Sequence, residues 1–321
     1  LNNFSKGSVW RKWDLHIHTP GTKKNDQYKL KNGNIWDEFC KEIEASEVQV
    51  FGITDYFSAD GYFNFINKFK TKHPNSEKVF FPNIELCTSD VVNKSGEEVN
   101  LHLIFDSNHQ DIESKIRKFL QILKINETGN EGVSRAASDL TLETEYNGAT
   151  TTRDYIYKAI SEVLGANYKK YLLIFTAVNG DGIRVSPLAN DGVETRGLNR
   201  KIIISDELDK FSDGFFGNSG NKDYFLLENR LDSNKKTFPK PVICGSDAHS
   251  LHDLGSFVGK QFLNKDGQIE KDITWIKADP TFEGLKQILI EPKDRVFIGD
   301  TPTIINRIKN HKTKYLKTIE V

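Results

Sequence analysis

The stretch WDLHIHTPG, residues 13–21, alternates apolar and polar side chains and then ends in a turn. We predict a strand over Trp13–His18, because alternation with a period of two is typical of strands and Thr-Pro-Gly is a turn signal. Side chains two positions apart on a strand project to the same side. His16 and His18 therefore face one cavity, which suits two ligands of one metal ion or of neighbouring ions.

Strand-like and helix-like patterns alternate from this stretch through most of the 321 residues. Strands are predicted at 50–54, 79–86, 99–105, 171–178, 201–205, 241–245 and 295–298, and helices at 35–48, 60–73, 112–123, 152–164 and 280–290. This alternation favours a largely parallel α/β sheet, open or closed into a barrel. The polar stretch 126–150 is rich in Gly, Ser, Thr and Asn and is expected to be a loop insertion.

The composition argues against several classes of protein. The charges nearly cancel, with 44 Lys+Arg against 45 Asp+Glu, which disfavours binding of nucleic acid through bulk positive charge. The three cysteines are far apart and form neither a disulfide framework nor a CxxC zinc motif, so a cytoplasmic location is expected. The sequence contains no run of 18 apolar residues, so we expect no membrane span and no membrane partner.

Acidic and histidine side chains cluster at the ends of the predicted strands. Asp55 and Glu85 end the second and third strands, His102 lies within the fourth, and Asp247 and His249 follow a later one. The carboxyl ends of parallel strands meet at one mouth of a barrel, where catalytic residues normally lie. Several buried ionisable groups at such a mouth are best explained by a ligand that they share.

Each of these residues also has a plain structural interpretation when it is taken alone. A single HxH pair more often binds no metal, His102 could be a core histidine, and Asp55 could cap the helix that follows it. The combined placement is harder to explain in this way, so we favour a metal site. The four other histidines are expected to be solvated: His73, His109, His252 and His311.

Five segments resemble, in order and spacing, the successive motifs of the PHP (polymerase and histidinol phosphatase) family. They are DLHIHTPG (14–21), FGITDYF (51–57), FPNIEL (81–86), VNLHLIF (99–105) and CGSDAH (244–249). The stretch WIKADPTFEGLKQILIEPKDRVFIG (275–299) further resembles the end of PHP domains in bacterial TrlF-like PHP-ATPase proteins. The resemblance implies a distorted seven-stranded (β/α) barrel of the PHP type over residues 1–300, with metal ions at its mouth and phosphoesterase activity.

The resemblance also implies roles for individual residues. Six positions match the family's metal ligands: His16, His18, Glu85, His102, Asp247 and His249. Asp55 matches the acid of the TDH motif, whereas Tyr56 stands where many PHP domains have a metal-binding histidine. A phenol is a poor ligand at neutral pH, because its pKa is about 10, but it could hydrogen-bond a phosphate oxygen. No histidine follows soon after His18 and none lies in 171–178, so we expect two ions rather than three.

A mixture of imidazole and carboxylate ligands suits Zn, Mn or Fe. Such an ion lowers the pKa of bound water from about 15.7 to about 7, and two ions can clamp the attacking and leaving oxygens of a phosphoester. We therefore expect metal-dependent phosphoester hydrolysis, with Asp55, Tyr56 and Arg184 as catalytic residues. Arg184, like Arg196 and Arg200, follows the fifth predicted strand and is placed to meet a phosphate.

The PHP-ATPase proteins are implicated in antiviral defence, so the resemblance implies a nuclease that acts with an SMC-like ATPase. The sequence has no GxxxxGK[ST] phosphate loop and no Met, so we expect a portion of a longer protein in which residues 301–321 lead towards the ATPase. The basic stretches 115–124 and 307–317 could contact nucleic acid or could be solvated surface. A small-molecule phosphomonoesterase of the histidinol-phosphatase type, a metal-poor binding module for an ATPase, and a homo-oligomer remain open.

Overall fold

The computed structural model describes residues 9–90, 98–127, 134–178, 182–183, 198–230 and 237–311, with only the backbone described for 198–203. A nine-stranded sheet forms the centre of this part of the chain. Its spatial order is β10 (Val242–Ile243), β9 (Gly214–Phe216), β8 (Leu172–Ala177), β4 (Val99–Phe105), β3 (Val79–Thr88), β2 (Val50–Tyr56), β1 (Trp10–His18), β13 (Thr274–Lys277) and β14 (Val296–Ile298).

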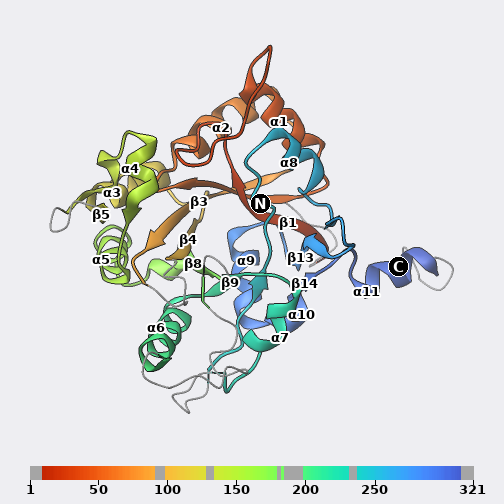
Figure 1. Ribbon diagram of the computed structural model, residues 1–321. Coiled ribbons are helices and arrows are strands. Elements are labelled where there is room, and N and C mark those ends of the chain that lie inside the picture. Colours follow the sequence, from red (N-terminus) through yellow and green to blue (C-terminus); the bar gives the residue numbers. More distant parts are fainter. Residues whose placement is uncertain are drawn as a thin grey trace.

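Helices surround this sheet (Figure 1). They are α1 (Ile35–Ala45), α2 (Asp60–Lys72), α3 (Ile112–Ile122), α4 (Glu143–Gly148), α5 (Arg153–Leu164), α6 (Leu198–Phe211), α7 (Lys222–Phe225), α8 (Leu251–Ser256), α9 (Phe282–Ile290), α10 (Pro292–Arg295) and α11 (Thr303–Asn310). Two smaller sheets lie outside the centre: β5 (Lys124–Glu127) between β6 (Arg135–Ala136) and β7 (Ala149–Thr150), and the pair β11 (Phe262–Leu263) and β12 (Ile269–Lys271). Within the residues just described, no helix is long and apolar enough to cross a membrane.

The sheet curls nearly into a closed barrel, because the segment that follows β10 lies beside β1. The amide of Asp247 donates to the carbonyl of His16 over 2.9 Å, and the amide of His18 donates to the carbonyl of Ala248 over 3.0 Å. The hydroxyl of Thr274, in β13, accepts a hydrogen bond from the amide of Cys244 over 2.8 Å. The expected α/β barrel is thus confirmed, although its sheet has nine strands where seven were expected.

The sheet is mixed: seven of its nine strands run in one direction, as a largely parallel sheet predicts, and β4 and β13 run against them. The pairs β1–β2, β2–β3, β8–β9 and β9–β10 are parallel, whereas β3–β4, β4–β8, β1–β13 and β13–β14 are antiparallel. Residues 89–98 join β3 to β4, and a parallel connection needs a crossover of about a dozen residues or more. The chain therefore returns antiparallel at this point, which places His102 directly opposite Glu85.

The helices pack apolar faces against the barrel. On one side, α1 and α2 bury Phe39, Ile43 and Phe65 in one cluster with residues of β2. The α1 helix begins where it does because the side chain of Asn34 accepts a hydrogen bond from the amide of Trp36 over 3.0 Å. Packing of this kind leaves the carboxyl ends of the strands as the open mouth of the barrel.

Two predicted segments have a different structure. Residues 201–205 were predicted as a strand but lie inside α6, because periodicity cannot distinguish a short apolar run in a strand from one in a helix. Residues 126–150 were expected to be a loop insertion. Their described part carries regular structure instead, namely the end of β5, then β6, α4 and β7.

Candidate metal centre

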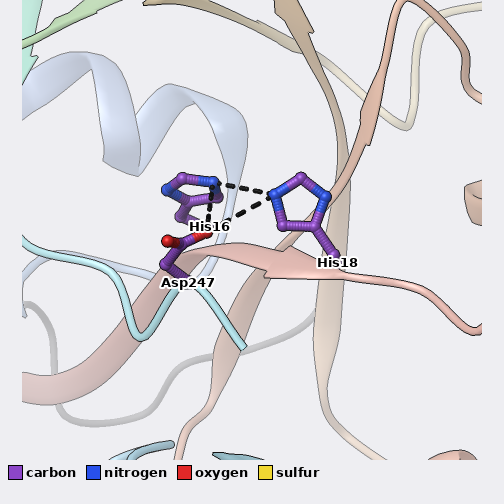
Figure 2. A group of neighbouring side chains, drawn as sticks. All are labelled: His16, His18 and Asp247. Carbon is purple, nitrogen blue, oxygen red and sulfur yellow. Dashed lines mark hydrogen bonds and ion pairs between the residues drawn. The ribbon is translucent and has the colours of Figure 1, made fainter. Parts of the chain in front are cut away.

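Three segments of the chain bring four ligand-type side chains together at the barrel mouth. His16 and His18 come from β1, Glu85 comes from β3, and Asp247 comes from the segment after β10. Figure 2 shows His16, His18 and Asp247 pointing toward one another, with the Nε2 atoms of the two histidines 3.1 Å apart. The Nε2 atom of His16 also lies 3.1 Å from Oε2 of Glu85 and 3.2 Å from Oδ1 of Asp247.

These separations match those between ligands of a single ion. The Nε2 atom of His18 lies 3.2 Å from Oε2 of Glu85 and 3.5 Å from Oδ1 of Asp247, so the separations given for the set span 3.1 to 3.5 Å. Ligand atoms held about 2.0–2.2 Å from one tetrahedral ion are about 3.3–3.6 Å apart, and slightly closer in octahedral geometry. The two histidines thus lie at ligand distance from both carboxylates, and His16, His18 and Asp247 form one group that could hold a divalent ion.

The charges of the set also call for a cation. Burial disfavours charge on Glu85 and by itself would raise the pKa of the carboxyl. The surrounding imidazoles of His102 and His16 have a larger, opposite effect, so this pKa lies well below its ordinary value. Burial likewise opposes charge on His18, but hydrogen bonds to Asp247 and Glu85 raise the pKa of this imidazole to about 9. A proton on His18 thus balances one of the two carboxylate charges, and a bound divalent cation could balance both.

His102 extends the site on the side of β4. His16, Glu85 and His102 form a second group whose ligand atoms all lie within 4.8 Å of one another. Burial is the main reason that the pKa of His102 falls to about 3, so its ring is neutral and keeps a lone pair for a metal ion. The side-chain nitrogen of Asn83 lies 3.2 Å from Nδ1 of this ring. His102 therefore joins the predicted ligands although it lies in the middle of a strand.

The rings of His249 and Tyr56 both stack against the ring of His18. The ring of His249 lies 4.0 Å from that of His18, and the ring of Tyr56 lies 4.6 Å from it, with interplanar angles of 15° and 21°. The Nε2 atom of His249 is 3.3 Å from Oδ1 of Asp247. Its Nδ1 atom is buried and has no hydrogen-bond partner among the described residues, which leaves it available to a ligand.

Asp55 lies below the mouth and makes the contacts of a positioning group. Its carboxylate is 2% exposed and accepts a hydrogen bond from the hydroxyl of Thr19 over 2.9 Å. A Cβ atom on Gly61 would lie only 2.1 Å from Oδ2 of Asp55, so glycine is required there. Burial raises the pKa of Asp55 to about 6, although the charge of His18 opposes the shift. Arg184, predicted to be catalytic, lies outside the described residues.

Sequence reasoning missed Asp14, which holds two ligand-bearing segments together. Its buried carboxylate accepts hydrogen bonds from the amide of His16 over 3.2 Å and from the amide of Ser246 over 3.1 Å. Asp247, the next residue, has φ = +53°, a left-handed conformation that is uncommon for a residue other than glycine. Asp14 stands two positions before His16, so a period-two extension of the HxH motif would have identified it.

The basic stretch 115–124 is partly neutralised by acidic neighbours. Arg117 forms ion pairs with Glu113 over 2.8 Å and with Asp60 over 2.9 Å. Both pairs are exposed, so they contribute little to stability but reduce the positive charge of this surface. The other basic stretch, 307–317, lies largely outside the described part of the chain, which ends at residue 311.

The comparisons with known proteins give only distant likenesses. No family model and no curated protein matches the sequence. A two-domain protein from Bacteroides vulgatus, which contains a predicted PHP-like metal-dependent phosphoesterase, overlaps 91% of this chain at 10% identity and a TM-score of 0.43. The overlap spans only 65% of that longer protein.

A second solved structure, described as a candidate metal-dependent phosphoesterase from Bifidobacterium adolescentis, overlaps 88% of this chain and 97% of its own. Its identity to this chain is 11% and its TM-score is 0.34. With TM-scores below 0.5, neither neighbour assigns a family or a function to this chain. The function is therefore inferred from the geometry of the centre.

Proposed function

We propose that this protein is a metal-dependent phosphoesterase. The observation that carries the proposal is the position of His16 and His18 at the mouth of an α/β barrel, where their Nε2 atoms lie 3.1 to 3.5 Å from each other and from carboxylate oxygens of Glu85 and Asp247. A divalent ion held by these residues would polarise a phosphoester and lower the pKa of a coordinated water. The mixed nitrogen and oxygen donors suit Mn, Zn or Fe.

The surrounding residues would position these groups. Asn100 donates a hydrogen bond to Oε1 of Glu85 over 2.8 Å and so leaves Oε2 directed at the histidines. Asp247 is the most open of the four, with a side chain 44% exposed, so we place the entry of substrate on its side. We assign Asp55 a positioning role through Thr19, and we retain Tyr56 as a group that could hydrogen-bond a phosphate oxygen.

We extend the proposal to two ions. The group of His16, Glu85 and His102 overlaps the first set, and the unpartnered Nδ1 atom of His249 offers a further ligand atom. Two ions about 3.5–4 Å apart would share the charge of a phosphate between them. Tyr56 in place of a histidine supports two ions rather than three, because a neutral phenol is a poor ligand.

We further propose a phosphodiester of nucleic acid as the substrate and an SMC-like ATPase domain or subunit as the partner, in an antiviral system of the cytoplasm. This extension is supported by the likeness of segments 14–21, 244–249 and 275–299 to the motifs of PHP-ATPase proteins. It is separable from the hydrolytic proposal, because a phosphomonoester substrate would use the same centre.

The first prediction compares the wild-type protein with the double variant His16→Ala/His18→Ala. Activity towards bis-p-nitrophenyl phosphate in the presence of Mn²⁺ should fall by about 100-fold or more, since two of the four ligands are lost. The single variant His252→Ala is a matched control, because His252 is exposed and lies outside both ligand groups.

Equal activity in the wild type and the double variant would contradict the proposal that this protein is a metal-dependent phosphoesterase. The ratio of rates with bis-p-nitrophenyl phosphate and p-nitrophenyl phosphate separates a phosphodiesterase from a phosphomonoesterase. Less than one ion per chain after reconstitution would instead favour a binding module without catalytic metal.

A further inference from the structure

A polar cavity of about 360 Å³ lies at the mouth of the barrel beside the metal centre. Three segments line it: Gly217–Ser219 after β9, Cys244 and Gly245 after β10, and Ile269–Asp272 in and after β12. The first two walls continue parallel strands from their carboxyl ends, the same edge of the sheet that carries the ligands. Its volume is within the range of about 300–1,000 Å³ that small-molecule sites occupy.

The cavity and the centre share their walls. Gly245 packs so closely on His16 that a Cβ atom at this position would lie 2.4 Å from the Cβ of the histidine. Phe216, which precedes the first wall, contacts the rings of His16 and His102 with centroid distances of 5.4 and 4.4 Å. A group attached to a phosphate at the centre would therefore reach the cavity directly.

The lining carries hydrogen-bond donors and acceptors that have no partner among the described residues. In the described part of the chain, Asp272 accepts hydrogen bonds only at Oδ1, from Gln261 and from the amide of Ile273, so its Oδ2 atom remains available. Within the same residues, neither the amide nitrogen of the Asn218 side chain nor the hydroxyl of Ser219 has a partner. Glu270 and Lys271 add a further acceptor and a further donor.

Charge and shape narrow the class of ligand. Glu270 and Asp272 outnumber Lys271, and burial raises the pKa of Cys244 to about 12, so this thiol adds no charge. A second phosphate would be repelled by such a surface. The lining residues include no aromatic side chain on which a base could stack, and Ile269 is their single large apolar one.

We propose that this cavity binds the sugar of the substrate, as a neutral ring with several hydroxyl groups. Alternating donors and acceptors suit hydroxyls, which both donate and accept hydrogen bonds. The sugar could be the ribose of a nucleotide or the ring of a sugar phosphate, and the chemistry of recognition is the same for both. That the sugar is part of a substrate rests on the proposed function. That the cavity binds a sugar does not.

Binding is tested with the full chain and with sugars that carry no phosphate. Saturation-transfer NMR should show contact with methyl riboside or methyl glucoside, and the stronger of the two signals identifies the source of the sugar. The variant Ser219→Trp fills the cavity from an exposed position and should abolish the signal. The isosteric Asp272→Asn keeps the Oδ1 acceptor and should weaken the signal, whereas Asp266→Asn, in the exposed turn of the same hairpin, should leave it unchanged.

Absence of any signal from both glycosides in the wild-type protein would overturn the proposal. So would a signal that survives in Ser219→Trp, because the sugar would then bind elsewhere. Proper folding of Ser219→Trp is checked by its metal content, which should equal that of the wild type.

Kinetics then separates this inference from the proposed function. Asp272→Asn should raise KM for ribose 5-phosphate or glucose 6-phosphate by about tenfold, the loss of a hydrogen bond to a charged acceptor, and leave KM for p-nitrophenyl phosphate, which has no hydroxyl group, within about twofold. Equal effects on sugar and non-sugar esters would contradict the sugar site. Binding of a glycoside by a wild-type protein that hydrolyses no ester would refute the phosphoesterase and leave the sugar site standing.

Discussion

Asp14 shows how one buried carboxylate can organise the candidate metal centre without being one of its ligands. It accepts hydrogen bonds from the amides of His16 and Ser246, which lie 230 residues or more from each other in the chain. Burial raises the pKa of this carboxyl, and the amide donors partly compensate for the loss of solvent. Two of the three segments that carry the ligands are thus fixed to one side chain.

We predict that Asp14→Asn reduces metal affinity by about 10- to 100-fold, the range measured when groups that orient metal ligands are replaced. The asparagine keeps the size of the side chain but offers one acceptor oxygen instead of two. Affinity is measured by competition with a chromophoric chelator, and circular dichroism confirms that the fold is retained. An unchanged affinity in a folded variant would show that Asp14 does not position His16 and Asp247.

At the scale of elements, the small sheet of β5, β6 and β7 is held to helix α4 by Glu145. Its Oε2 atom accepts hydrogen bonds from the amides of Thr141 and Leu142 over 2.7 and 2.9 Å, and its Oε1 atom pairs with Arg135 over 3.1 Å. The hydrogen bond from the amide of Leu142 is the main cause that lowers the pKa of Glu145 to about 2. This carboxylate closes the amino-terminal turn of α4.

The depressed pKa predicts a stabilisation that depends on pH. Glu145→Gln should speed amide hydrogen exchange over residues 142–146 severalfold at pH 6, because the charged acceptor is lost. A group with a lowered pKa stabilises fully above its ordinary value of 4.5, and this stabilisation is lost as the pH falls towards about 2. The difference between variant and wild type should therefore shrink at pH 3. A difference that grows on acidification would contradict this role.

Local patterns predicted most of the elements that carry the ligands, since β1 to β4 and the helices between them follow clear periodicity. They failed where the outcome depends on distant parts of the chain. Residues 201–205 became helical in α6, and the strand β13, which pairs antiparallel with β1, has no predicted counterpart. Strand direction is set by tertiary pairing, so the antiparallel register that brings His102 to Glu85 was not readable from the local sequence.

The same limit applies to the site. The convergence of His16, His18, Glu85 and Asp247 was predictable because residues two apart on a strand share a side and strand ends share a mouth. The stacking of Tyr56 against His18 was not predictable, since it depends on the register between β1 and β2. The roles given to Asp55 and Arg184 stay predictions, the first with the contacts of a positioning residue.

For the whole molecule, the centre joins β1 and β3 to the segment that closes the barrel, so metal binding should stabilise the entire fold. An ion at 100 times its dissociation constant adds about 2.7 kcal/mol to the free energy of unfolding. We predict that Mn²⁺ or Zn²⁺ raises Tm by about 5 °C in the wild type. The isosteric variant Asp247→Asn, which tolerates the left-handed backbone, should lose most of this shift.

Differential scanning fluorimetry with and without chelator measures this shift. His252→Ala should behave like the wild type, because its side chain lies outside the ligand groups. A shift of the same size in Asp247→Asn would place the stabilising ion at another site.

The closure of the barrel through residues 244–248 also sets when the candidate centre can form. During synthesis His16 leaves the ribosome more than 200 residues before Asp247. Until then the histidines of β1 have neither their fourth ligand nor the backbone partners that align them. A nascent or truncated chain would therefore hold no complete centre, so the proposed activity could begin only once the barrel has closed.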